Sequence, residues 1–191
     1  MYLENIVFDA ADPRRLGRLW ESVIGGETLS DEDAGYETRL AIEGGPVLDL
    51  CFQPVPLAAQ GPSRLHVDLA QSAGSGPIAT LRLESGSPDD DAQFWAWLSG
   101  WHADPERPDA LRHPSGRGPL LVCSRESAPK TSGKNRVHLD IRLESGDDAA
   151  QVADEIVRRG GRELPPLADG LPWRLFADPS GNEFCLLPAR A

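Results

Sequence analysis

Residues 173–187, with the sequence WRLFADPSGNEFCLL, predict two short strands joined by a tight turn at residues 178–181. Pro179 presets φ for the second turn position, and Asp178 can accept a hydrogen bond inside the turn. Gly181 can take the positive φ that returns the chain in the antiparallel direction. The segment is therefore expected to form a β-hairpin.

The chain before this hairpin predicts a strand and a helix. Apolar and polar residues alternate over residues 136–143, RVHLDIRL, which is the period of a strand with one buried face. A helix is expected to begin at Asp147, to bury Val152 and Ile156, and to end at Gly160. Together with the hairpin, these elements predict a βαβββ module.

Two internal repeats indicate that the module occurs more than once. The motif LRLESG at residues 81–86 almost duplicates IRLESG at residues 141–146, and each leads into an acidic helix start. RLHVDL at residues 64–69 repeats RVHLDI at residues 136–141 position for position. With a further strand, helix and strands at the start of the chain, the sequence predicts three modules and one extra strand.

The strand HLDI, the helix and the segment WRLFADPSGNEFCL closely resemble the second module of glyoxalase-like proteins. These belong to the vicinal oxygen chelate superfamily, which includes glyoxalase I, extradiol dioxygenases and bleomycin-resistance proteins. The resemblance implies an α+β fold of repeated βαβββ modules, paired so that curved sheets enclose a cleft. The resemblance does not identify a reaction or a metal requirement, because the superfamily contains both metalloenzymes and metal-free binding proteins.

How three modules pair is open at this point. The middle and last modules, residues 78–125 and 135–191, are expected to form one paired domain over residues 78–191. The first module and the extra strand, residues 1–70, would then lack a partner, and a homodimer would cover the unpaired sheet. The alternative is a degenerate pair within the chain, between the first module and residues 65–125.

The resemblance also implies where a metal would bind. In metal-dependent relatives, the ligands come from the first and closing strands of each module. The matching positions here fall near Asn5, near Leu50 with Asp49 adjacent, and at His138 and Cys185. Two donors at most, His138 and Cys185, would converge, which is fewer than a divalent metal requires. We therefore expect no metal and no other cofactor.

The candidate ligand-binding residues are polar or aromatic side chains on predicted strands. The pairs His66/Asp68 and His138/Asp140 each project from one face of a strand, about 6.5 to 7 Å apart, where they either line the cleft or face water. No catalytic residue is predicted. The full set of candidates is His138, Asp140, Arg142, Trp173, Cys185, His66 and Asp68.

The composition limits the partners and the location. The formal net charge of −11 disfavours nucleic acid and favours neutral or cationic small molecules. Three widely spaced cysteines match no metal or redox motif, and no segment resembles a leader or a membrane span. These features predict a cytoplasmic protein with a small-molecule ligand.

Three functions remain open from the sequence. The first is a metal-independent small-molecule binding protein of the bleomycin-resistance kind, because carboxylate ligands are missing. The second is a metal-dependent lyase, isomerase or dioxygenase with a non-standard site, so whether the protein is an enzyme stays undecided. The third is a scaffold for assembly.

Overall fold

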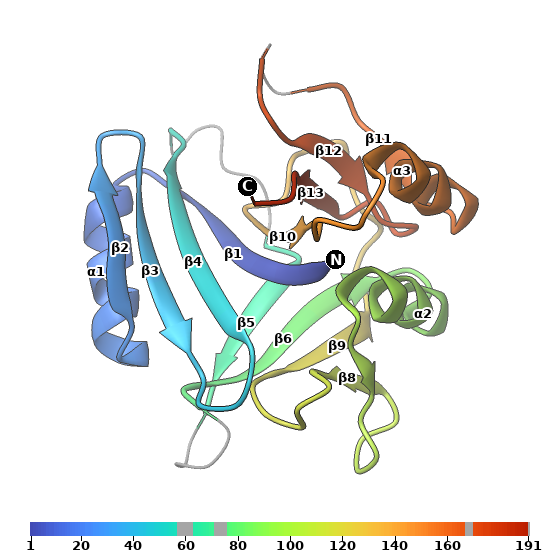
Figure 1. The fold of residues 1–191 in the computed structure, drawn as a ribbon, viewed down its shortest axis with the longest axis horizontal. Helices are drawn as coiled ribbons and strands as arrows, with labels where there is room; N and C mark the ends of the chain where they lie inside the picture. Colours follow the sequence, from blue (N-terminus) through green and yellow to red (C-terminus); the bar gives the residue numbers. More distant parts are fainter. Residues whose placement is uncertain (57–62, 71–75, 167–169, 191) are drawn as a thin grey trace.

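The computed structural model describes residues 1–56, 63–70, 76–166 and 170–190, and within them the βαβββ order occurs three times (Figure 1). The first module contains β1 Tyr2–Ala10, α1 Pro13–Ile24, β2 Glu27–Glu32, β3 Gly35–Ala41 and β4 Val47–Pro54. The middle module contains β6 Ile78–Ser85, α2 Pro88–Ser99, β7 His102–Ala103, β8 Ala110–Arg112 and β9 Leu120–Arg125. The last module contains β10 Val137–Arg142, α3 Ala149–Arg158, β11 Arg162–Glu163, β12 Arg174–Ala177 and β13 Glu183–Leu187. The extra strand is β5 Leu65–Leu69.

The predicted hairpin is confirmed as β12 and β13. Gly181 has a φ of 86° and its N–H donates to the carbonyl of Asp178 at 2.9 Å. The carboxylate of Asp178 accepts a hydrogen bond from the N–H of Asn182 at 2.8 Å. Turn chemistry that is local in sequence therefore fixes this element, as the proline and glycine positions predicted.

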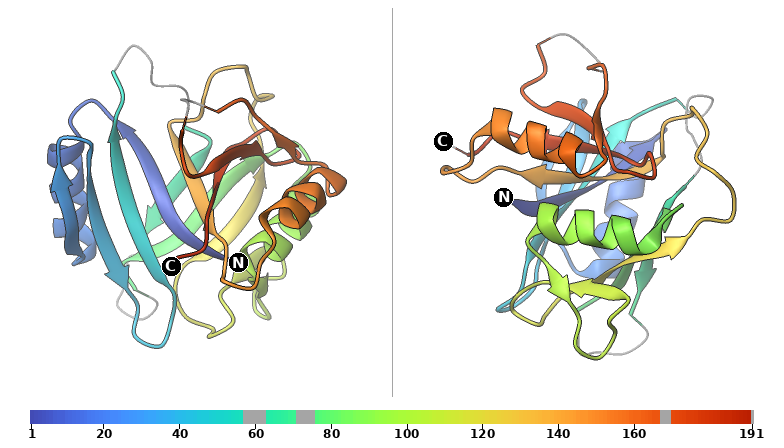
Figure 2. Two further views of the ribbon diagram at one scale, coloured as in Figure 1. Left: turned by 45° about the horizontal axis from the view of Figure 1, so that its top comes forward. Right: turned by 90° about the vertical axis from the view of Figure 1, so that its right-hand side faces the viewer.

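The strands form two sheets, and their order differs from the expected pairing. The first sheet has eight strands in the order β11-β12-β13-β10-β1-β4-β3-β2, and the second has five in the order β5-β6-β9-β8-β7. Strands β1 and β10 are antiparallel neighbours, with Asn5 opposite Asp140 and Val7 opposite His138. The first and last modules therefore share one continuous curved sheet (Figure 2).

The expected pairing of the middle with the last module is wrong, and so is the alternative pair between the first module and residues 65–125. The extra strand β5 joins the middle module by pairing with β6, which leaves β10 free to bond β1. The first module thus has a partner in its own chain. This removes the reason given for a homodimer, which stays a prediction that sedimentation would test.

The middle module is attached through its helix α2. One continuous apolar core includes residues of both sheets and of all three helices. In it the ring of Phe184 from β13 contacts Phe94 and Trp95 of α2, with ring centroids 5.9 Å and 5.5 Å apart. The guanidinium of Arg159, after α3, lies 4.7 Å from the ring centre of Trp97, so α2 and α3 lie side by side (Figure 2).

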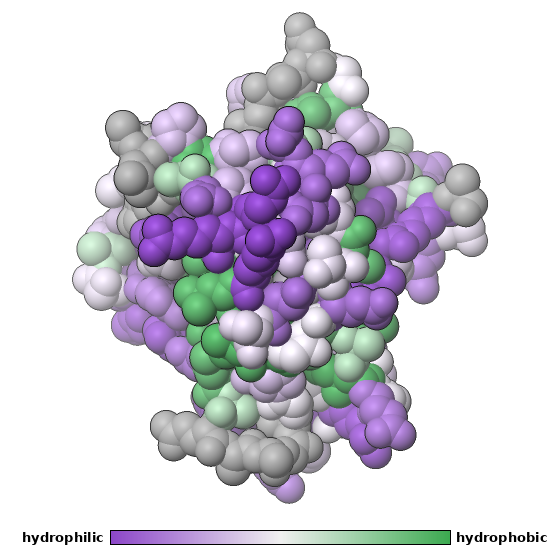
Figure 3. Space-filling view, turned by 90° about the vertical axis from the view of Figure 1, so that its left-hand side faces the viewer, coloured by the Kyte–Doolittle hydropathy of each residue, from purple (hydrophilic) through white to green (hydrophobic). Residues whose placement is uncertain are grey.

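The side of the molecule that carries α1 and β2 is largely hydrophilic, with apolar patches between the polar side chains (Figure 3). Arg14 and Arg18 of α1 both pair there with Asp31 of β2. Leu19 and Val23 are exposed on α1. None of the helices over the described residues is long and apolar enough to cross a membrane.

Candidate functional site

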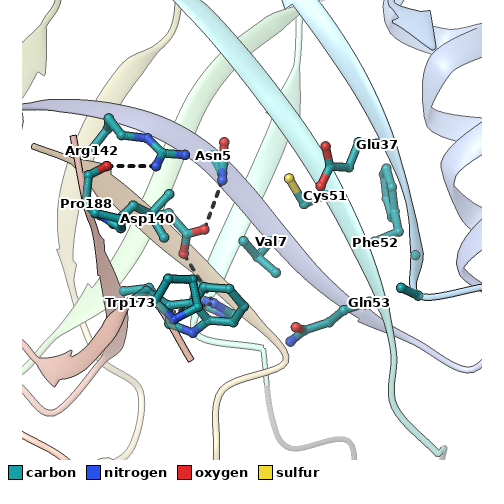
Figure 4. A pocket seen from close by; sticks show the side chains of 16 residues that line it. Asn5, Val7, Glu37, Cys51, Phe52, Gln53, Asp140, Arg142, Trp173 and Pro188 are labelled. Atoms are coloured by element: carbon teal, nitrogen blue, oxygen red, sulfur yellow. Dashed lines mark hydrogen bonds and ion pairs between the residues drawn. The ribbon is translucent and has the colours of Figure 1, made fainter. Parts of the chain in front are cut away.

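The face of the eight-stranded sheet that points away from the core carries a cleft of about 420 Å³. Strands alternate their side chains between two faces, so Ile6 and Leu139 enter the core while Asn5 and Val7 line the cleft (Figure 4). His138 lines the same cleft. The cleft lies across the junction of the first and last modules. Its lining residues are Asn5, Val7, Ala34, Gly35, Glu37, Cys51, Phe52, Gln53, His138, Asp140, Arg142, Pro172, Trp173, Cys185, Leu187 and Pro188.

A buried row of polar side chains forms part of the cleft wall. The side-chain amide of Asn5 donates to Asp140 Oδ2 at 3.0 Å. His138 Nε2 lies 3.5 Å from Asp140 Oδ1 and 3.7 Å from Cys185 Sγ. His138, Asp140 and Cys185 are 5%, 6% and 5% exposed, so each loses most of its hydration.

Burial shifts the protonation of this row toward neutral forms. Desolvation, followed by the charge of Lys134, lowers the pKa of His138 to about 3. Desolvation raises the pKa of Asp140 to about 7, although hydrogen bonds from Asn5 and Cys185 act in the opposite direction. Burial and the nearby Asp140 also raise the pKa of the Cys185 thiol. Near pH 7 the row holds a neutral imidazole, a thiol and a carboxyl group that titrates.

Three of these side chains could hold a metal ion. One donor atom from each of His138, Asp140 and Cys185 lies within 4.8 Å of the others. The expectation of two donors was therefore wrong, because Asp140 adds a third on the same strand as His138. Three protein ligands and one open position suit a catalytic zinc site.

The surroundings of the His138 imidazole suit a metal site less well than the three donor atoms do. A metal-binding histidine usually donates its second ring N–H to an acceptor. Among the described residues, His138 Nδ1 is buried without a hydrogen-bond partner. The three donor atoms therefore suit a divalent metal. The acceptor that would hold the imidazole ring through Nδ1 is missing among the described residues.

The other two candidates from the last module also reach the cleft. Arg142 lines it, but its guanidinium is already paired with Glu4 at 2.5 Å and donates to the carbonyl of Pro188 at 2.9 Å. Trp173 is 36% exposed at the cleft, where its ring forms an apolar wall. The structure thus brings five predicted residues together: His138, Asp140, Arg142, Trp173 and Cys185.

The remaining two candidates, His66 and Asp68, do not line this cleft. They lie on β5 in the five-stranded sheet, where His66 Nε2 is 3.4 Å from Glu84 and Asp68 is 3.5 Å from Arg82. These are cross-strand contacts between β5 and β6. The sequence repeat that suggested equal roles for the two His-x-Asp pairs does not place them in one site.

Residues of the first module form the other half of the cleft, and the sequence did not single them out. Glu37, Cys51, Phe52 and Gln53 come from β3 and β4. They were missed because the cleft was expected between the other two modules. The alternation of apolar and polar residues along β3 could have indicated which of them face the cleft, since Tyr36 is buried and Glu37 is exposed.

Comparison with known proteins supports the fold. A model of the glyoxalase-like domain matches residues 5–86 and again residues 80–187. No curated protein matches the chain.

Solved structures similar to the chain include a putative dioxygenase from Bacillus subtilis, at 13% identity and a TM-score of 0.44. That alignment covers 100% of this chain and 63% of that one, so this chain spans less than two thirds of its length. Glyoxalase I from Zea mays has 15% identity and a TM-score of 0.43, with 98% of this chain and 68% of that one covered. The family matches extend over nearly the whole sequence, and the chain therefore belongs to the glyoxalase-like domain family of the vicinal oxygen chelate superfamily.

Proposed function

We propose that the protein binds a small organic molecule in the cleft without needing a metal, as bleomycin-resistance proteins do. The cavity carries the proposal, because its volume of about 420 Å³ falls in the usual range for small-molecule pockets, roughly 300–1,000 Å³. The cleft also combines apolar walls with a few converging polar groups, which is the usual composition of such sites.

Each wall has a distinct part in this proposal. Trp173 offers aromatic surface to the body of the ligand. Asn5, His138 and Asp140 offer hydrogen-bonding groups whose positions are fixed by the central strands β1 and β10. A ligand that covers this row would restore hydrogen bonds to groups that burial has removed from water.

Truncating Trp173 to alanine is expected to lower the affinity of any ligand bound in the cleft by about tenfold to a hundredfold. Loss of the aromatic wall removes buried apolar contact worth about 1.5–3 kcal/mol. Hits from a thermal-shift screen of small molecules would be measured by calorimetry, with Trp173→Phe expected to retain most of the affinity. Leu19→Ala, on exposed α1, is the control. Equal binding by Trp173→Ala and the wild type would place the site elsewhere.

A metal-dependent lyase, isomerase or dioxygenase is the second candidate. The observation in its favour is the convergence of His138, Asp140 and Cys185. A divalent metal held there would supply a Lewis acid for a substrate oxygen. Asp140 would have to lose its proton and Cys185 would have to bind as a thiolate, so metal binding would release protons.

Elemental analysis separates the two candidates. We expect protein purified without chelator to contain less than stoichiometric zinc, nickel, manganese or iron, because His138 lacks an acceptor for Nδ1 among the described residues. One metal ion per chain that is lost in Cys185→Ala would instead establish the metalloprotein. Cys123→Ala is the matched control, since Cys123 is also buried but lies in the five-stranded sheet.

A further inference from the structure

The arginine side chains around the cleft leave two of its carboxyl groups without a cationic partner. Arg39 pairs with Asp49 through two hydrogen bonds, of 2.8 and 2.7 Å. Glu4 accepts from Arg142 at 2.6 Å and from Arg190 at 2.8 Å. These three guanidinium groups face four carboxyl groups, which are those of Glu4, Glu37, Asp49 and Asp140.

Glu37 is one of the two carboxyl groups that no cation meets among the described residues, and Asp140 is the other. Glu37 lies on β3, its side chain is exposed, and no ion pair joins it to a basic group among the described residues. Desolvation by the cleft walls, followed by the carboxylate of Asp49, raises the pKa of Glu37. A positive charge on a ligand would relieve both effects.

A second unsatisfied group lies across the cleft. Asp140 Oδ1 and His138 Nδ1 are buried without hydrogen-bond partners in the described part of the chain. Both residues line the cleft. Asp140 is 6% exposed at the cleft, so its carboxyl would accept from a hydroxyl or amide donor of the ligand once Oδ1 turns toward the cleft, independently of Glu37.

The spacing of the two groups sets the shape of the ligand. Glu37 is on β3 and Asp140 on β10, and β4 and β1 lie between them in the sheet. Three strand spacings amount to about 14 Å between backbones, and side chains on the concave face of a curved sheet reach toward one another. One ring with a short chain on it would span the gap, with Val7 beneath and Trp173 beside it (Figure 4).

We propose that the ligand is a cationic aromatic amine, with its ammonium group on Glu37 and a hydrogen-bond donor at its other end on Asp140. This inference rests on the proposed function, since it names the ligand class of the same cleft. It adds a residue of the first module, Glu37, as the one that selects for charge.

Four compounds of nearly equal size test the charge and the donor separately. Tyramine has the amine and the phenol, and tyrosol replaces the amine with a neutral hydroxyl. 2-Phenylethylamine lacks the phenol, and 4-hydroxyphenylacetate places an anion in the position of the amine. Calorimetry at pH 7.5 is expected to give tyramine the highest affinity, tenfold or more above tyrosol, and 4-hydroxyphenylacetate the lowest.

Two variants assign these differences to residues. Glu37→Gln is expected to lower tyramine affinity by about tenfold to a hundredfold and to leave tyrosol unchanged, because only the charged contact is lost. Asp140→Asn should reduce the preference for tyramine over 2-phenylethylamine. Glu43→Gln is the control for net charge, since Glu43 is exposed and lies outside this cleft.

The possible outcomes separate this inference from the proposed function. If tyrosol or 4-hydroxyphenylacetate binds as tightly as tyramine and Trp173→Ala weakens it, the cleft binds ligands but not by charge, and the inference fails alone. If none of the four binds and a broader screen finds no cleft ligand, both fail. Equal loss of tyramine affinity in Glu37→Gln and Glu43→Gln would also overturn the role of Glu37.

Discussion

Replacing Arg64 with alanine is expected to lower the free energy of unfolding by about 3–5 kcal/mol, the usual cost of breaking a buried ion pair from one side. Arg64 is only 4% exposed. Its guanidinium donates to Asn182 Oδ1 at 2.8 Å, to Glu126 Oε2 at 2.6 Å and to the carbonyls of Glu84 and Ala128. These partners belong to the middle module, to the link after it and to the hairpin turn of the last module.

The loss follows from what the truncation leaves behind. Without Arg64, the carboxylate of Glu126 and the carbonyl of Ala128 keep their partial burial and lose their donor, whereas the carbonyl of Glu84 keeps a hydrogen bond from the side-chain amide of Asn182 at 2.9 Å. A buried acceptor without a partner is costly. Asn182 would lose one partner of its own network with Asp178 and Asn135. Urea denaturation should show a lower midpoint with little change in slope.

Arg136 provides the matched control because it occupies the same position in the sequence repeat. It is exposed, and no side-chain ion pair joins it to the rest of the described chain. We expect Arg136→Ala to change the free energy of unfolding by less than about 0.5 kcal/mol. Equal effects of the two substitutions would mean that the Arg64 network does not hold the modules together.

The same repeat marks how far the sequence could predict the structure. RLHVDL and RVHLDI were expected to behave alike, and both do form strands. Yet β5 is an edge strand and β10 lies inside an eight-stranded sheet. His138 is consequently buried beside Cys185, while the side chain of His66 is 32% exposed beside Glu84.

Local signals were sufficient for the first strand, the helix and the hairpin of the last module. Asp12 caps α1, Pro13 opens it, and a left-handed Gly25 ends it, so its ends are also set by residues local in the sequence. The partner of a strand is not a local property, because β1 and β10 are more than 120 residues apart and many strands present the same alternation. The pairing could therefore not be predicted from periodicity.

The errors about the site follow from that one misplaced pairing. Four of the five predicted residues that line the cleft, among them His138 and Cys185, lie on the last module's own strands. Glu37 and Cys51 became cleft residues only when the first module took the place expected for the middle one. The third potential metal donor, Asp140, was missed because its distance from the other two donors, within 4.8 Å, depends on how the side chains around β10 pack.

Raising the pH from 5 to 8 is expected to destabilise the protein through Asp178, the first residue of the hairpin turn. Asp178 is 0% exposed and accepts hydrogen bonds from Asn182 at 3.0 Å and from the indole of Trp95 at 3.1 Å. Burial, followed by the charge of Asp91, raises its pKa to about 7. Asp91 on α2 is itself fully buried, and neither of its carboxylate oxygens has a hydrogen-bond partner among the described residues.

The loss of stability with rising pH follows from the proton that Asp178 retains in the folded state. Between about pH 4 and 7 folded Asp178 holds a proton that the unfolded chain has already released. The resulting stability is fully present below the unfolded pKa and is lost as the pH rises through 7. A shift from 3.8 to about 7 corresponds to on the order of 4 kcal/mol. Asp140 contributes in the same direction, whereas His138, which is buried neutral, favours folding more as the pH rises toward 6.5.

The substitution Asp91→Asn isolates the contribution of the Asp91 and Asp178 carboxyl groups to the pH dependence of stability. The variant keeps Asp140 and His138, so their contributions cancel when its pH dependence is compared with that of the wild type. Removing the neighbouring charge lowers the pKa of Asp178, and the fall in unfolding free energy between pH 5 and 8 should become shallower. Asp89→Asn changes an exposed carboxylate in the same helical turn and should leave the pH dependence as it is. Urea titrations at several pH values measure all three proteins. A wild type whose stability rises from pH 5 to 8, or equal slopes in the wild type and Asp91→Asn, would show that Asp178 does not hold its proton in the folded state.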